Sequence, residues 1–235
     1  MRLLAIILIA ISLNSCTKGS PVKATAITLM IDRTDTIIPS PEPGIVQELI
    51  NIEASPNNGI IFRFQNIGNT DYNSTYKAVL GDHSVLDNQL IRQAEVGKFF
   101  RKIDTLIFRE NSHEYHFNTS SIITPLLQQL TTLKNETASE KVAVIWTDLG
   151  EISDVYNILT HKNRKMVLNE PTKVVEHFKR QLDIPDLNGV TLYIAHLPKT
   201  REQNRMFRGM CKVYEELFKD SGLELHIGLD QQLKL

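Results

Sequence analysis

Single apolar strands alternate with helical segments along most of this chain, and this alternation restricts the fold more than any other feature. The expected strands cover residues 25–31, 60–64, 74–80, 141–147, 190–196 and 223–229. The expected helices cover residues 43–53, 85–108, 122–134, most of 152–182 from about Ser153 and Asp154 onward, and 201–220. Parallel neighbouring strands need a crossover connection, which is usually a helix. The sequence therefore predicts a three-layer α/β/α sandwich with a mostly parallel central sheet.

One pair of strands breaks the alternation. Residues 60–64 and 74–80 follow each other without a helix between them, so we expect a hairpin-like pair at one edge of the sheet. The sequence has no internal repeat and no long low-complexity linker. One domain over residues 25–235 is the simplest interpretation of its 235 residues.

The first 24 residues have the pattern of a targeting segment. Arg2 precedes an apolar run over residues 3–13, which matches a signal peptide and is shorter than the roughly twenty residues of a membrane-spanning helix. The following Leu-Asn-Ser-Cys, ending at Cys16, resembles the bacterial lipobox. It implies a signal peptide over 1–15, a lipid on Cys16 and a short tether over 16–24, whereas an ordinary signal peptide with an incidental cysteine is the alternative.

On that interpretation the protein is lipid-anchored to a membrane of the bacterial cell envelope. Thr17 and Lys18 follow the cysteine without an acidic run, so we expect a periplasm-facing protein. Cys211, the other cysteine, lies among apolar residues at helical spacing and is expected to be a buried small hydrophobe rather than a disulfide partner. A formal net charge of −1 gives no basic footprint, so no nucleic acid is expected as a partner.

Polar loops follow two of the apolar strands directly. Asp32, Thr34 and Thr36 follow strand 25–31, and Asp148 follows strand 141–147 within Thr-Asp-Leu-Gly-Glu. Ligands of open α/β sheets bind at the carboxyl ends of the strands. Carboxylates beside hydroxyls at that edge are suited to a hard cation such as Mg2+.

These motifs resemble those of the von Willebrand factor A (VWA) domain. Asp32-x-Thr34-x-Thr36 is similar to the family's Asp-x-Ser-x-Ser, Ser121 to its lone hydroxyl before the next helix, and Asp148 to its Asp after the fourth strand. The resemblance covers about residues 24–230. It implies a VWA-like fold and a metal-ion-dependent adhesion site. There Thr34, Thr36 and Ser121 would ligate Mg2+ (or Mn2+) directly, and Asp32 and Asp148 would act largely through water.

The sequence departs from the family pattern at two places. The second loop lacks the usual glycines and offers Thr119, Ser120 and Thr124 as rivals of Ser121, and Leu149 interrupts the turn after Asp148. A competing interpretation of the same residues is purely local: Asp32 and Thr34 cap the following turn, and Asp148 caps the next helix.

We therefore expect a binding module for an unidentified protein or peptide, not an enzyme. One alternative is a metal-dependent phosphoester hydrolase, and the other is a metal-free structural adaptor of the cell envelope. The hydrolase would use the acidic residues of the two loops, namely Asp32, Asp35, Asp148, Glu151 and Asp154.

Overall fold

Six strands form one sheet in this computed structural model, which describes residues 24–34, 41–50, 52, 56–69, 73–84, 88–117, 119–196 and 198–228. The strand order is β3-β2-β1-β4-β5-β6. The strands are β1 (Ala24–Asp32), β2 (Gly59–Ile67), β3 (Thr75–Leu80), β4 (Glu140–Trp146), β5 (Thr191–Ala195) and β6 (Glu224–Ile227). Only the β2–β3 pair is antiparallel, and β3 lies at the sheet edge, which confirms the hairpin-like pair expected from the sequence.

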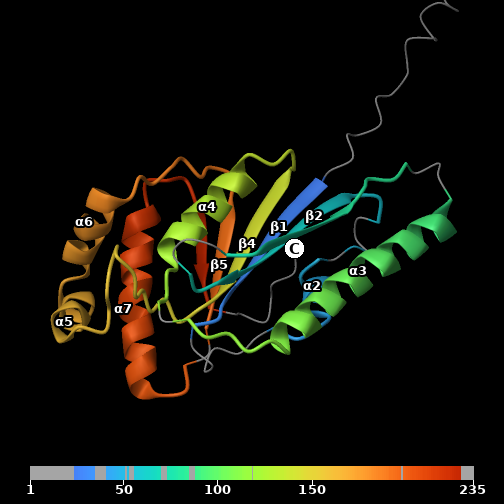
Figure 1. Cartoon of the computed structure of the whole chain (residues 1–235). Helices are drawn as coiled ribbons and strands as arrows, with labels where there is room; N and C mark the ends of the chain where they lie inside the picture. Colours follow the sequence, from blue (N-terminus) through green and yellow to red (C-terminus); the bar gives the residue numbers. More distant parts are fainter. Residues whose placement is uncertain are drawn as a thin grey trace, which may run out of the picture.

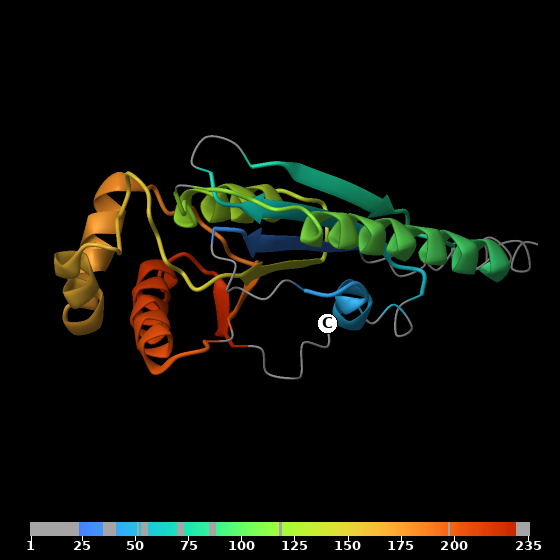
Figure 2. The ribbon, with the colours of Figure 1, turned by 60° about the horizontal axis from the view of Figure 1, so that its bottom comes forward.

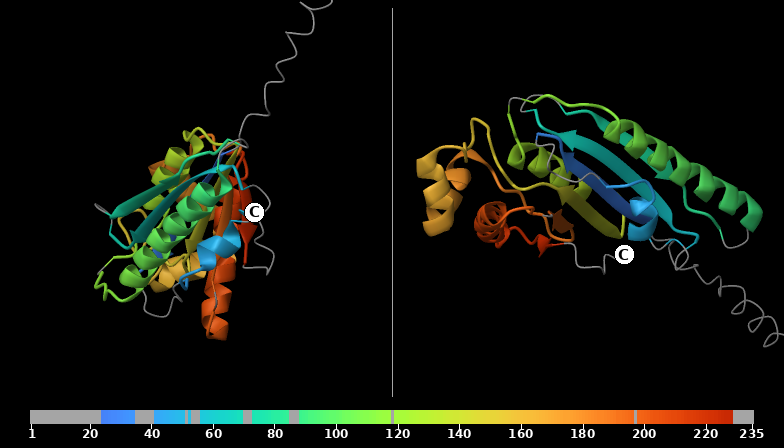
Figure 3. Two further views of the ribbon diagram at one scale, coloured as in Figure 1. Left: turned by 90° about the vertical axis from the view of Figure 1, so that its right-hand side faces the viewer. Right: turned by 90° about the horizontal axis from the view of Figure 1, so that it is seen from below.

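The helices lie at the two ends of the sheet and on its faces. They are α2 (Ile45–Leu49), α3 (Gln89–Asn111), α4 (Ile123–Lys134), α5 (His161–Asn169), α6 (Pro171–Gln181) and α7 (Arg201–Phe218). Figure 1 shows α5, α6 and α7 gathered toward one edge of the sheet and the long α3 toward the other, and the right-hand view of Figure 3 agrees. No helix of the described residues is long and apolar enough to cross a membrane.

Two hydrophobic clusters cover the two faces of the sheet, because neighbouring strand residues point to opposite sides. In β1, Ala26 and Met30 belong to one cluster with residues of α4, α6 and α7, whereas Ile27, Leu29 and Ile31 belong to the other with residues of α2 and α3. The α/β/α sandwich with a mostly parallel sheet is thus confirmed. Cys211 is buried in the first cluster as a free thiol, as expected.

The segment after β4 corrects one prediction. A helix was expected from about Ser153, but α5 begins only at His161, where the Thr160 side chain accepts a hydrogen bond from the backbone of Asn163. Before it, Ile152 forms isolated β-bridges with Ser120 and with Asn157. Backbone groups that are used in such bridges are not available for a helix. The first part of the predicted helix is therefore an irregular loop that contacts the segment before α4.

Candidate metal centre

The carboxyl ends of β1 and β4 lie side by side in the sheet. The two strands pair in parallel, with Ile31 opposite Trp146, so Asp32 and Thr147 leave the sheet at the same edge. The predicted approach of the two polar loops is confirmed by this register.

The side chain of Asp32 is buried, with 1% of its surface exposed. One carboxylate oxygen, Oδ1, accepts hydrogen bonds from the backbone N–H of Thr34 (3.0 Å) and its hydroxyl (2.6 Å), and Oδ2 accepts from the Thr147 hydroxyl (2.8 Å). Burial raises the pKa of Asp32 to about 6, although these hydrogen bonds oppose the rise, and the charge of Asp148 adds to it. Each group that holds the carboxylate is a neutral donor.

Thr34 connects β1 to the loop before α4. Its hydroxyl oxygen lies 3.0 Å from the hydroxyl oxygen of Ser120, which is 2% exposed. The bridge between Ser120 and Ile152 holds Ser120 in place through hydrogen bonds of 3.0 and 2.8 Å. The loop after β4 therefore positions the hydroxyl that meets Thr34. The sequence offered Ser120 only as a rival of Ser121.

Aromatic and polar contacts hold the segment between α3 and Ser120. The ring of Phe117 lies so close to Gly68 that a Cβ on this glycine would come within 2.5 Å of it, and the Thr119 hydroxyl donates to the Gly68 carbonyl oxygen (3.1 Å). Tyr115 stacks on Phe117 with ring centroids 5.7 Å apart. The segment is thereby fixed to the end of β2.

The remaining predicted ligands divide into three cases. Ser121 is fully buried, and its hydroxyl has no hydrogen-bond partner in the described part of the chain. Thr36 lies outside the described residues, as do Asp35 and Cys16. Asp148 is half-buried, and its Oδ1 accepts from the backbone N–H of Gly150 (2.7 Å).

The local interpretation of the loops is therefore correct in part. Asp32 and Asp148 both accept from the backbone N–H two residues onward, the pattern of an Asx turn, but Asp148 does not cap α5. Leu149 adopts a φ of 62°, which is unusual for a residue with a side chain. Its fully buried side chain and the hydrogen bond from its N–H to the Thr147 hydroxyl (2.9 Å) hold this conformation.

Glu151 has a role that was not predicted. It is fully buried, and its Oε2 accepts from the backbone N–H groups of Ile122 and Ile123 (both 2.9 Å) at the start of α4. Its other carboxylate oxygen bonds to the Ser153 hydroxyl. Burial raises the pKa of Glu151, these hydrogen bonds oppose the rise, and the charge of Asp32 adds to it. The sequence placed Glu151 at this edge but did not indicate that its carboxylate would accept hydrogen bonds from the N–H groups at the start of α4.

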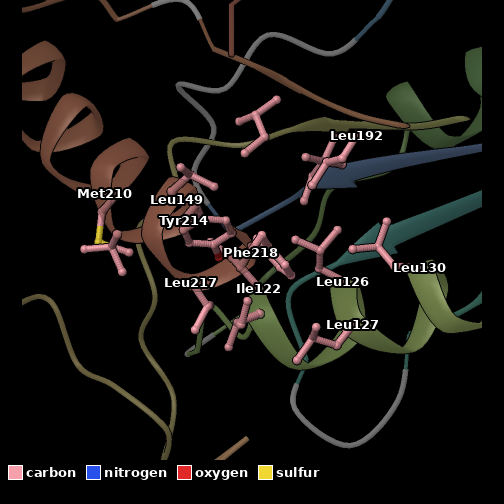
Figure 4. Packing of buried hydrophobic residues seen from close by; sticks show 14 of the residues in the cluster. Ile122, Leu126, Leu127, Leu130, Leu149, Leu192, Met210, Tyr214, Leu217 and Phe218 are labelled. Atoms are coloured by element: carbon pink, nitrogen blue, oxygen red, sulfur yellow. The ribbon is translucent and has the colours of Figure 1, made fainter. Parts of the chain in front are cut away.

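Tyr214 lies beneath these carboxylates. Figure 4 shows its side chain among Leu149, Phe218 and other buried apolar residues. The phenol oxygen has no hydrogen-bond partner among the described residues, and burial raises the pKa of Tyr214 well above its ordinary value, with the charges of Glu151 and Asp32 adding to the rise. Two buried hydroxyls without partners, those of Ser121 and Tyr214, thus accompany the buried carboxylates.

The described part of this centre contains hydroxyls and carboxylates, the oxygen ligands that a hard cation takes. Among the described residues, no three His, Cys, Asp or Glu side chains are grouped closely enough to hold a metal ion by themselves. Two neighbouring ligands of an ideal octahedral Mg2+ with bonds of 2.0–2.1 Å lie about 3 Å apart. The Thr34 and Ser120 hydroxyl oxygens have this separation, and in this structure a hydrogen bond joins them.

The acidic residues of the hydrolase alternative lie in different surroundings, and Asp35 lies outside the described residues. Asp154 is exposed and lines a separate hollow of about 560 Å³ with Tyr156 and His177, whereas Asp32 and Glu151 are buried. The charge of Asp148 raises the pKa of Asp32, and the charge of Asp32 raises the pKa of Glu151, so these three carboxylates influence one another.

Comparisons with known proteins show a likeness of fold. No protein-family model and no curated protein matches the sequence. The SpRpn10 VWA domain is 12% identical over 89% of this chain and 90% of its own, with a TM-score of 0.40. The PilB minor pilin from Streptococcus sanguinis is 10% identical over 92% of this chain (TM-score 0.49), and its D319A mutant is 9% identical over 92% (TM-score 0.51).

This chain spans 60% of the length of the pilin and 59% of that of the mutant. At such identities the similarity concerns the fold alone. The fold is the α/β/α sandwich with a mostly parallel sheet that the sequence predicted.

Proposed function

We propose that this protein is a membrane-anchored binding module that engages a protein or peptide partner through a cation at the carboxyl ends of β1 and β4. The observation that carries this proposal is the set of polar groups around Asp32. Its buried carboxylate is held by neutral donors, beside a pair of hydroxyls 3.0 Å apart. A buried carboxylate is stabilised by a proton or by a nearby cation. The resemblance of the loop motifs to those of the VWA domain supports a role in protein binding.

In this proposal the hydroxyls of Thr34 and Thr36, with Ser120 or Ser121, hold Mg2+ or Mn2+ directly. Asp32 and Asp148 accept hydrogen bonds from metal-bound water. When bound, the cation would supply an electrophilic position for a carboxylate oxygen of the partner. Glu151 keeps the start of α4 in place through its bonds to Ile122 and Ile123.

The proposed site lies at the end of β1 that is farther along the chain from the proposed anchor at Cys16. Lipid on Cys16 would hold the membrane near Ala24, where β1 begins, and Asp32 ends this strand of nine residues. Nine residues of a parallel strand span about 30 Å. The carboxyl edge of the sheet would then face away from the membrane, toward a partner in the periplasm.

A titration of the full chain with Mn2+ by calorimetry tests the metal site. We expect saturable binding that weakens by about tenfold or more in Thr34→Val and Ser120→Ala. Thr132→Val is the matched control, because the Thr132 hydroxyl donates to the carbonyl oxygen of Gln128 within the exposed part of α4 (2.8 Å). The absence of Mn2+ binding in the unmodified protein would leave the metal-free adaptor as the better interpretation.

Ser121→Ala distinguishes the two neighbouring serines. A loss of Mn2+ affinity in Ser121→Ala with none in Ser120→Ala assigns the ligand to Ser121, as the VWA resemblance implied. Hydrolysis of a generic phosphoester that requires Mn2+ and Asp32 would instead favour the enzyme.

The anchor is tested in cells. Cys16→Ser is expected to move the protein from the membrane fraction to the soluble fraction and to abolish incorporation of labelled palmitate. Recovery of the unmodified chain in the soluble fraction, without label, would contradict lipidation.

A further inference from the structure

A basic groove runs between the edge strand β3 and the helix α3. Figure 2 shows the two elements running side by side, and residues of the two elements are in contact. The groove has a volume of about 570 Å³. Five of its ten lining residues are cationic and none is acidic, although the whole chain has a formal net charge of −1. The cations are Lys77, Lys98, Arg101, Lys102 and Arg109.

The cations of α3 form one stripe along the helix. Lys98, Arg101, Lys102 and Arg109 recur at intervals of three, one and seven residues, which places them on one face over about 16 Å of helix. The six residues of β3 span a similar length, about 20 Å. A ligand that lies along the strand therefore meets the whole stripe.

The acidic residues of α3 are directed elsewhere. Asp104 accepts from the backbone N–H of Gly44 (2.9 Å) and the amide of Gln47 (3.2 Å) near α2, and Glu110 is buried in contacts of its own. Glu95 lies 3.9 Å from the guanidinium of Arg92. The carboxylates that could neutralise the stripe are thus engaged away from it.

Three of the five cations have no acidic partner in the described part of the chain. Lys77 pairs with Glu136, and Arg109 with Glu110, but Lys98, Arg101 and Lys102 are exposed and form no ion pair with another described residue. A solvated helix surface can carry such charges. Their concentration beside an apolar floor of Ala78, Ile103 and Leu106 indicates a ligand that is both anionic and partly apolar.

The strand beside the groove has an edge that no other described strand covers. β3 pairs with β2 on one side and is the last strand of the sheet on the other. Unpaired backbone groups of an edge strand can bind an extended peptide as an additional strand. Alternate residues of such a peptide lie on the same face, about 6.7 Å apart, which is close to one turn of α3.

We propose that this groove binds an extended acidic segment of a partner protein, which pairs with the edge of β3 and directs alternate carboxylates toward Lys98, Arg101 and Lys102. The concave shape and apolar floor favour a peptide over a bilayer, whose flat surface would not reach Ala78 or Ile103. The groove is formed by β3 and α3 and does not depend on the proposed metal site.

The test uses a labelled peptide of alternating Glu and Val and the full chain, with binding followed by fluorescence anisotropy at about 0.15 M salt. The groove variant carries Lys98→Glu, Arg101→Glu and Lys102→Glu, and should bind at least tenfold more weakly. The control carries Lys165→Glu, Arg208→Glu and Lys212→Glu, the same charge change on exposed residues of α5 and α7, and should bind as the unmodified chain. Equal losses in both variants would overturn the proposal, because they indicate general attraction to charge.

Two further measurements separate the parts of the proposal. A peptide with N-methylated backbone keeps its charge but loses N–H donors, so we expect at least tenfold weaker binding, and unchanged binding would overturn strand pairing. Phosphatidylglycerol vesicles are expected not to bind. Vesicle binding that is lost only in the groove variant would overturn the peptide in favour of a membrane. Circular dichroism melting verifies folding, and the triple Gln variant at the same three positions replaces the Glu variant if that one unfolds.

Discussion

Two buried carboxylates at the carboxyl edge of the sheet, those of Asp32 and Glu110, are held in opposite ways. Glu110, near the end of α3, accepts from the amide of Asn66 (2.7 Å), from the Tyr115 hydroxyl and from the guanidinium of Arg109 (2.9 Å). Burial raises the pKa of Glu110, but these hydrogen bonds outweigh it and hold the pKa below its usual range. Burial dominates at Asp32 and raises its pKa to about 6.

The two clusters differ in their partners: the Tyr115 hydrogen bond lowers the pKa of Glu110 most, and among the described residues only the Glu110 cluster also includes cations. The cluster around Glu110 contains Arg109 and is continued by Arg33, whose guanidinium donates to Asn66 and to Asn111 (both 2.9 Å) and lies 5.6 Å from the centre of the Tyr115 ring. The cluster around Asp32 is held by hydroxyls and backbone N–H groups. The partners of Glu110 therefore stabilise its charged carboxylate, and we call its group the complete cluster. The carboxylate of Asp32 would be stabilised further by a cation or a proton.

The largest effect is expected for Glu110→Ala, which disrupts the complete cluster. Glu110→Ala removes the acceptor of Asn66 and Tyr115, and each hydrogen bond to a charged group contributes about 1.5–3 kcal/mol, so we expect the free energy of unfolding to fall by about 4 kcal/mol. The pair with Arg109 adds little because that side chain is 60% exposed. Urea unfolding measures the change, and a loss below about 1 kcal/mol would contradict the structural role. Glu114→Ala, on an exposed residue nearby, is the control.

The next effect concerns pH at Asp32. Its pKa rises from 3.8 to about 6 on folding, so the folded state binds the proton more tightly than the unfolded state. Stability without metal should fall as the pH rises from about 4 to about 6, by on the order of 3 kcal/mol, and stay low above that range. Asp32→Asn should remove this contribution and be more stable than the unmodified chain at pH 7. Urea midpoints across this range measure it.

The effect of added Mn2+ on stability tests whether a cation can replace the proton at Asp32. If a cation replaces the proton, Mn2+ should stabilise the unmodified chain at pH 7 more than at pH 5 and leave Asp32→Asn nearly unchanged. The same pH slope in both proteins, with or without Mn2+, would show that Asp32 is not the titrating group.

The sequence was sufficient for the elements that depend on local pattern. The apolar runs ending at Ile31 and Trp146 predicted two parallel strands, and the residues after them predicted a shared polar edge. The sequence was not sufficient where contacts between distant residues determine the local structure. Ser120 rather than Ser121 contacts Thr34 because Ser120 bridges to Ile152, and the same bridge replaces the first part of the helix predicted after β4.

The contacts of the complete cluster could not be predicted from the sequence either. Tyr115 lies in a polar stretch whose local pattern gives neither helix nor strand, and its contacts reach β2 and α3 at once. Glu151 is similar, because only the folded chain brings its carboxylate to the N–H groups of α4. The lipid anchor, the metal and the protein partner stay predictions.

A smaller effect tests whether the complete cluster supports the other one. Tyr115→Phe keeps the stacking on Phe117 but removes the hydroxyl shared with Glu110 and Asn66, so we expect a loss of about 2 kcal/mol. Because this segment leads to Ser120, Mn2+ affinity should also fall, by about tenfold. Unchanged Mn2+ affinity in a folded variant would show that the two clusters act independently. Tyr76→Phe, in the neighbouring strand β3, is the control.

The smallest effect has the opposite sign. The Tyr214 hydroxyl is buried near Glu151 and Asp32 without a hydrogen-bond partner in the described part of the chain, so Tyr214→Phe should raise the free energy of unfolding of the metal-free protein by about 1 kcal/mol. Tyr156→Phe is the matched control, because it removes a hydroxyl that donates to the carbonyl oxygen of Asn163 (3.1 Å) and should lower stability by about the same amount. Thermal and urea unfolding of the two variants measure both signs. Destabilisation by Tyr214→Phe would mean that the phenol stabilises the carboxylates, and the contrast between the complete and the incomplete cluster would then be smaller than these contacts indicate.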